Sequence, residues 1–101
     1  MEQAVRAARL ADQIRDYLAE WAARDMPGSF FSITQVTLHT DLSVATAWID
    51  VLRPEEGDTV MRSLEQHLPA YQRRLGRALR RRLVPRLHIR KDDQATLEIG
   101  Q

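Results

Sequence analysis

The chain has 101 residues, of which 44% are hydrophobic and 29% are charged, and its formal net charge is +1. This length suits one domain with a modest core, and the lack of cysteine excludes a disulfide scaffold, a thiol nucleophile and a thiolate-bound metal. Charged residues occur throughout the segment 1–21, so we expect neither a signal peptide nor a membrane span there, and a cytoplasmic protein.

The positive charge is concentrated in one stretch. Residues 73–91 contain nine basic residues and no acid, whereas the rest of the chain contains six basic and fourteen acidic residues. A concentrated positive surface on a small domain is typical of a protein that binds a polyanion. The alternative is a solvated helix face whose charge is neutralised by acids from elsewhere in the fold; we favour polyanion binding.

A first helix is predicted by apolar residues at helical period, which are Leu10, Ile14, Tyr17, Leu18 and Trp21. This helix should end before Met26, because Pro27 disfavours helical geometry at the residue that precedes it.

Two strands should follow as an antiparallel hairpin, over residues 30–38 and 44–52. In the first, the apolar alternation of Phe31 and Ile33 slips by one residue before Val36, which indicates either a β-bulge near Thr34-Gln35 or a short irregular strand. In the connection, Asp41 should bond nearby backbone N–H groups; we favour that role over a contact with RNA.

Next comes a helix with Asp58 as its N-cap, which Pro69 interrupts because proline cannot donate to the carbonyl of Glu65. We therefore expect a second helix over 70–83, meeting the first at a kink around His67, Leu68 and Pro69. Its inward side chains should be Tyr71, Leu75, Ala78, Leu79 and Leu83.

Gly76 lies inside this second helix, where it should permit a close approach of another segment. Residues 86–90 alternate like a third strand. The predicted order is α-β-β-α-α-β, an α+β fold with a three-stranded sheet packed by helices. The domain should occupy residues 1–92, and residues 93–101 should form a short tail.

This order is that of the type II KH fold, and two segments resemble the ribosome-binding factor A family. Residues 32–52 are similar to the family hairpin, in which an I-T-x-V-x-(V/L)-x-x-D-L-S-x-A run leads into a strand ending in V-L. Residues 75–89 look like the family's L-G-(K/R)-x-L stretch followed by P-x-L-x-F. The resemblance covers roughly residues 5–93.

The chain departs from the family pattern in two places. Family members have an Ala-x-Gly kink between the two helices, where this chain has His67-Leu68-Pro69. Pro69 can supply the break, but it offers no N–H for an RNA contact. The chain also ends soon after Asp93, without the usual C-terminal helix or tail, so we expect a divergent or shortened member.

The resemblance implies a non-catalytic assembly factor that binds immature small-subunit rRNA near the decoding site and assists late maturation. Release by a GTPase or an initiation factor is the family expectation, and we expect a monomer. We expect no cofactor, small-molecule substrate or membrane partner. The residues expected to bind RNA are Arg73, Arg74, Arg77, Arg80, Arg81, Arg82, Arg90 and Lys91.

Other functions remain as alternatives. The arginine-rich helix could dock an acidic protein partner, or the chain could be a peripheral membrane binder, although the core should claim the leucines of that helix. Trp48 is either a base-stacking platform or a partly buried residue, and we favour the second. His39, His67 and His88 lie on three different elements and form no close-spaced pair, which argues against a metal site. No arrangement of catalytic residues is recognisable, so we expect no enzyme.

Overall fold

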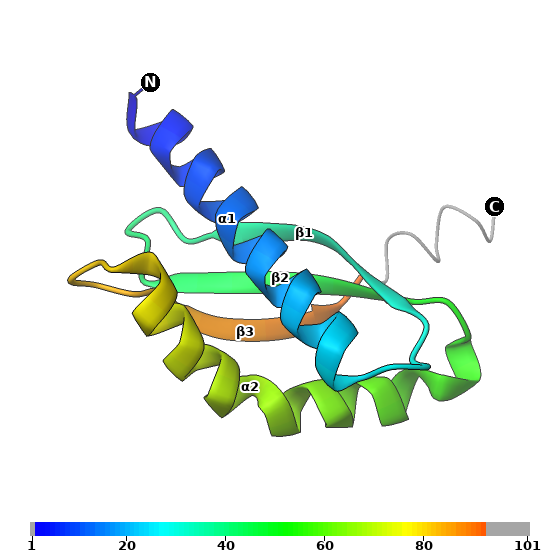
Figure 1. Cartoon of the computed structure of the whole chain (residues 1–101). Coiled ribbons are helices and arrows are strands. Elements are labelled where there is room, and N and C mark those ends of the chain that lie inside the picture. Colours follow the sequence, from blue (N-terminus) through cyan, green and yellow to red (C-terminus); the bar gives the residue numbers. More distant parts are fainter. Residues whose placement is uncertain (1, 93–101) are drawn as a thin grey trace, which may run out of the picture.

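The computed structural model describes residues 2–92, and the predicted tail at 93–101 lies outside the described residues. A three-stranded sheet carries two long helices (Figure 1). In chain order, the elements are α1 (Glu2–Asp25), β1 (Phe31–Leu38), β2 (Val44–Val51), the short 3-10 helix η1 (Pro54–Glu56), α2 (Gly57–Leu79) and β3 (Arg86–Lys91).

The sheet has the strand order β1-β2-β3. β1 and β2 pair antiparallel, as the predicted hairpin requires, and β3 pairs parallel to β2. The register of β1 shifts between Ile33 and Gln35, so the predicted β-bulge is confirmed. The bulge lets both Ile33 and Val36 face the core, where their side chains are buried.

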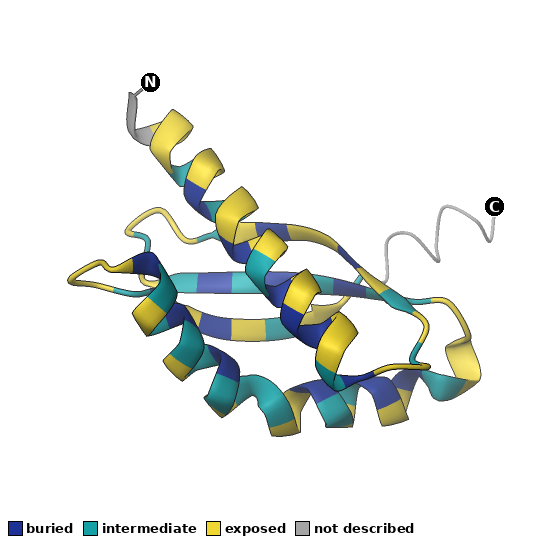
Figure 2. Cartoon of the chain, in the orientation of Figure 1, coloured by how far each residue is buried: buried dark blue, intermediate teal, exposed yellow. Residues whose placement is uncertain are grey.

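The core lies between one face of the sheet and the two helices. The predicted stripe of α1 is confirmed, since Leu10, Ile14, Leu18 and Trp21 are buried and Tyr17 packs against them. The buried side chains of the sheet and of α2 are Ile33, Val36, Ala45, Ala47, Ile49, Leu87, Val60, Leu64, Tyr71, Leu75 and Leu79. Figure 2 shows these buried positions alternating with exposed ones along both helices.

The region around Pro69 differs from the prediction of two separate helices. α2 runs without interruption from Gly57 to Leu79 with Pro69 inside it, and Figure 1 shows the helix changing direction about halfway along its length. A proline that lacks its N–H bends the helix here without ending it, because the turns on both sides are held by core contacts. The expected kink is present, within one helix.

Three further expectations about this helix are wrong. Asp58 is not the N-cap, because η1 leads directly into α2 and Glu56 takes the capping position. A Cβ at Gly76 would meet no atom within 4 Å, so no segment approaches closely there. The helix ends at Leu79 and not at Leu83, whose side chain is 80% exposed.

Candidate nucleic-acid interface

The arginines at the end of α2 lie partly on the helix and partly on the loop that follows it. Arg73 and Arg77 are exposed and separated by one turn, so they share one side of α2. Arg80 adopts a left-handed conformation with φ 50° and ψ 40°, which ends the helix. Arg81 and Arg82 therefore belong to an exposed loop. The predicted helix over 70–83 would have placed them on a helix face.

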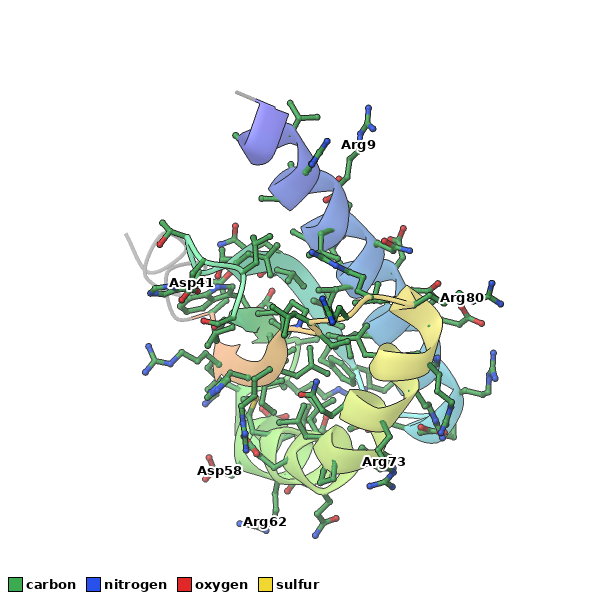
Figure 3. All side chains as sticks on the ribbon, turned by 90° about the vertical axis from the view of Figure 1, so that its left-hand side faces the viewer. Arg9, Asp41, Asp58, Arg62, Arg73 and Arg80 are labelled. Carbon is green, nitrogen blue, oxygen red and sulfur yellow. The ribbon has the colours of Figure 1, made fainter. Side chains whose placement is uncertain are left out.

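Five arginines consequently form one exposed group, which we call the arginine surface: Arg73, Arg77, Arg80, Arg81 and Arg82. Figure 3 shows Arg73 and Arg80 on the same side of the molecule, with Asp41 on the other side. Arg9 of α1, also exposed, lies above them on that side in the same view. Among residues 2–92, no acidic side chain forms an ion pair with any member of the arginine surface.

Arg74 has a different environment from its neighbours. Its Nη1 lies 3.2 Å from Oδ2 of Asp25, at the end of α1. Its guanidinium also lies over the rings of Trp21 and Tyr71, at 5.9 and 5.7 Å from their centroids. We therefore assign Arg74 to the contact between α1 and α2, where a charged and stacked arginine joins the two helices.

The hydroxyl of Tyr71 is buried beside this contact. Burial raises the pKa of Tyr71 to about 12, and the negative charge of Asp25 adds to the effect. Although Asp25 is near, the hydroxyl has no partner at hydrogen-bonding geometry among the described residues. An unpaired buried hydroxyl costs folding free energy. Because the side chain of Tyr71 is buried, a ligand cannot reach it, and we assign Tyr71 no part in binding.

Arg90 and Lys91 lie at the far end of β3 from the arginine surface. Arg90 is paired in register with Trp48 of β2. The Lys91 amine reaches the start of α2, since a Cβ at Gly57 would lie 2.9 Å from its Nζ. The six-residue strand separates these two cations from the loop by roughly 20 Å, so Arg90 and Lys91 lie apart from the arginine surface.

Two of the three predicted kink residues border a cleft between α2 and β3. Leu68 and Pro69 line this cleft of about 570 Å³, together with Glu65, Gln72, Val84, Arg86 and Leu87. His67 lies 2.8 Å through its Nδ1 from the carbonyl of Ser63, and its ring stacks on Tyr71. The imidazole is therefore held within the helix, and its Nδ1–H donates to that carbonyl.

Asp41 has the structural role predicted for it. Its Oδ1 accepts hydrogen bonds from the backbone N–H and the hydroxyl of Ser43 and lies 3.0 Å from Nδ1 of His39. The hydrogen bonds from Ser43, followed by the one to His39, lower the pKa of Asp41 to about 2. The carboxylate thus stabilises the turn between β1 and β2.

The described residues contain neither a metal-binding cluster nor a membrane-spanning helix. Between residues 2 and 92, no group of three histidine, cysteine, aspartate or glutamate side chains is arranged to hold a metal ion. Neither helix in that part of the chain is long and apolar enough to cross a membrane.

Some exposed residues near the candidate surfaces were not predicted from the sequence. Arg9 lies outside the basic stretch, and only the packing of α1 brings it to the same side of the molecule as Arg80. Arg86 and His88 alternate with buried residues along β3, and this period-two pattern was a signal that could have placed them on the exposed face of the sheet.

Comparison with known proteins agrees with the fold. A family model described as Ribosome-binding factor A matches residues 6–98. Ribosome-binding factor A of Staphylococcus saprophyticus is 32% identical over 94 residues, which cover 88% of this chain and 82% of that protein.

Two structures of the Thermus thermophilus factor are similar to this chain. The crystal structure is 28% identical, with a TM-score of 0.71, and the match covers 84% of this chain and 93% of that one. A homology model fitted into the cryo-EM map of a complex with the 30S subunit is 30% identical. Its TM-score is 0.69, and the match covers 87% of this chain and 97% of that one. With the α+β fold, the β1–β2 hairpin and this family match in agreement, the chain belongs to the ribosome-binding factor A family.

Proposed function

We propose that this protein binds immature small ribosomal subunits through their rRNA and assists late rRNA maturation without catalysing a reaction. Membership of the family and the relative fitted into a 30S complex support the choice of partner. The observation that carries the proposal is the arginine surface, five exposed cations without an acidic partner among residues 2–92. Such a surface gains binding free energy from phosphates by releasing counterions.

Recognition of this kind reads shape and backbone. Arginines one turn apart on a helix, and others on the adjacent loop, suit phosphates along a groove better than base edges. If all five members each neutralise one phosphate, the logarithm of the affinity falls against the logarithm of salt concentration with a slope of about −4. A slope near zero would contradict an electrostatic interface.

Release and stoichiometry belong to the same proposal. The chain carries no glycine-rich loop of the kind that cradles a nucleotide phosphate, so nucleotide hydrolysis by the protein itself does not supply release. As the family resemblance implies, we assign release to a GTPase or an initiation factor acting on the subunit. We also propose that the protein acts as a monomer.

Cosedimentation with small subunits tests the proposal. Arg77→Glu and Arg81→Glu, alone and together, should progressively remove the protein from fractions that contain small subunits or their precursors, while circular dichroism stays unchanged. Arg62→Glu is the control for the single changes, since it alters the net charge equally at an exposed site of α2 away from Arg73 and Arg80 (Figure 3).

The outcomes separate the proposal from its competitor. Retention of the double variant on the subunits would reject the arginine surface as the binding site. Recovery of an acidic protein without any rRNA would favour a protein-docking role. Loss of binding in Arg62→Glu as strong as in Arg77→Glu would show that net charge, and not this surface, decides binding.

A further inference from the structure

The exposed face of the sheet, opposite the helices, holds a partly exposed tryptophan in a fixed position. Trp48 lies on β2, the central strand, and is paired with Gln35 of β1 and Arg90 of β3. Its indole N–H donates a hydrogen bond to Oγ1 of Thr37 at 3.0 Å. This bond satisfies the polar end of the ring and holds its orientation, so the ring needs little ordering when a ligand stacks on it.

Basic side chains occupy the same face of the neighbouring strand β3, with Arg90 level with the ring. Arg86, His88 and Arg90 occupy alternate positions of β3 and are all exposed, which places them on the same face about 7 Å apart. None of them forms an ion pair within residues 2–92. The nearby acid Asp92 accepts a hydrogen bond from the hydroxyl of Thr34 at 2.8 Å.

A cleft of about 640 Å³ opens beside the ring. Its lining combines an aromatic wall, apolar side chains, an amide, two cations and one carboxylate; the residues are Gln35, Trp48, Met61, Ile89, Arg90, Lys91 and Asp92. The volume is in the range of small-ligand sites. One planar wall next to cations is the combination that holds a nucleotide, with the base on the ring and the phosphate on the basic side chains.

We propose that this cleft binds one unpaired nucleotide of RNA by stacking its base on Trp48, with Arg90 and Lys91 on the adjoining phosphate. The inference rests on the proposed function and adds a second contact to it. The arginine surface contacts backbone, whereas this site requires a base that is free of its partner strand. Double-stranded RNA keeps its bases stacked inside the helix and cannot supply one.

The test measures binding of two labelled RNAs, an unstructured single strand of about eight nucleotides and a blunt-ended duplex, to the full chain. Trp48→Thr removes the ring and leaves a residue that suits an exposed strand position. It should weaken binding of the single strand by about fivefold to a hundredfold. Binding of the duplex should stay unchanged because it has no unpaired base to stack on the ring. The salt dependence for both RNAs should also stay unchanged, because no charge is removed.

Two variants serve as controls. Trp48→Phe keeps an aromatic ring and should bind the single strand within a few-fold of the original chain. Val44 lies on the same strand and the same face, four residues before Trp48, and the Val44→Thr variant should bind both RNAs normally. In the unchanged protein, the single strand should also quench tryptophan emission, since Trp21 is buried in the core and Trp48 is the accessible indole.

The results distinguish this proposal from the one on which it rests. Equal binding of the single strand by the folded Trp48→Thr variant would overturn the stacking site and leave the arginine surface unaffected. If only the double variant Arg77→Glu and Arg81→Glu loses binding of the single strand, and Trp48→Thr keeps it, the stacking site is likewise overturned. If Trp48→Thr fails to fold, an unaltered affinity of Arg90→Gln for the single strand, with no quenching in the original chain, overturns the proposal.

Discussion

The side-chain amide of Gln72 accepts a hydrogen bond from the backbone N–H of Leu87 at 2.8 Å. The same amide donates to the carbonyl of Pro85 at 3.0 Å. Leu87 lies on β3, whose other edge pairs with β2. The side chain of Gln72 thus makes the hydrogen bonds that a fourth strand would make at the start of β3, on the free edge of the sheet.

Replacing Gln72 should therefore destabilise the protein more than its partly exposed position suggests. Gln72→Ala leaves two backbone groups without their partner, and we expect the free energy of unfolding to fall by about 1–3 kcal/mol. Urea denaturation measures this fall. Gln66→Ala, at an exposed site of the same helix, should change the value by less than about 0.5 kcal/mol; equal effects of the two changes would contradict the role of Gln72.

Arg74 should affect stability and leave RNA binding intact. Arg74→Ala removes the ion pair with Asp25 and the contact with the Trp21 ring, so we expect the free energy of unfolding to fall by about 1–2 kcal/mol. Arg73→Ala should show the reverse pattern, with normal stability and a weaker salt dependence of RNA binding. A shallower salt dependence of RNA binding in the Arg74→Ala variant would show that Arg74 contacts RNA, and would contradict this assignment.

Tyr71→Phe should not destabilise the protein, because the hydroxyl that it removes is buried and unpaired among the described residues. We expect an equal or higher free energy of unfolding at neutral pH. The pKa of Tyr71, raised to about 12, gives a second signature. The folded state disfavours ionisation, so the contribution of Tyr71 to stability is complete below pH 10 and decreases as the pH rises toward 12. Between pH 10 and 12, the midpoint of thermal unfolding should decrease less steeply with pH for Tyr71→Phe than for the original chain.

Gly76→Ala should stabilise α2. A Cβ there meets no atom within 4 Å, and alanine in a helix interior is favoured over glycine by about 1 kcal/mol. Gly28→Ala is the contrasting variant, since Gly28 has φ +86° and alanine would be strained in that conformation. Thermal denaturation of the two variants should therefore move in opposite directions. A lower midpoint for Gly76→Ala would show that another segment does pack there.

Arg80→Gly should raise stability and lower affinity for RNA. Arg80 has φ 50°, a left-handed conformation that costs a residue with a side chain about 1–2 kcal/mol and glycine almost nothing. Removing the cation should also make the salt slope of RNA binding shallower by about one unit. Arg80→Lys keeps both charge and strain and should change neither measurement. Unchanged stability of Arg80→Gly would contradict the left-handed conformation.

The regular elements could be predicted from the sequence because their signals are local. The period of Leu10, Ile14 and Leu18 placed α1, and the slipped alternation after Ile33 revealed the bulge. The end of α2 could not be placed, because a leucine at position 83 continues the helical pattern and nothing in an arginine marks a left-handed cap. The prediction for Gly76 was wrong for a similar reason, because the sequence alone does not show whether another segment packs against a helical glycine.

The candidate site was harder to predict, because it depends on contacts between distant segments. The charge of Arg74 was visible in the sequence, but its pairing with Asp25 follows from the crossing of α1 and α2. In the same way, the separation of Arg90 from Arg80 follows from the direction of β3. Charge concentration predicted that a surface exists, and the fold decided which arginines belong to it.

The parallel pairing of β3 with β2 has a consequence for how the molecule is made. The hairpin and α1 involve neighbouring segments, whereas β3 reaches the sheet only after the whole of α2 has crossed over it. Contacts between residues far apart in the chain form slowly, since closing the loop costs entropy before any pairing compensates for it. The loop arginines and Arg90 are positioned by that last strand. We therefore expect a newly made chain to order the loop arginines and Arg90 of the proposed RNA-binding surfaces late in folding.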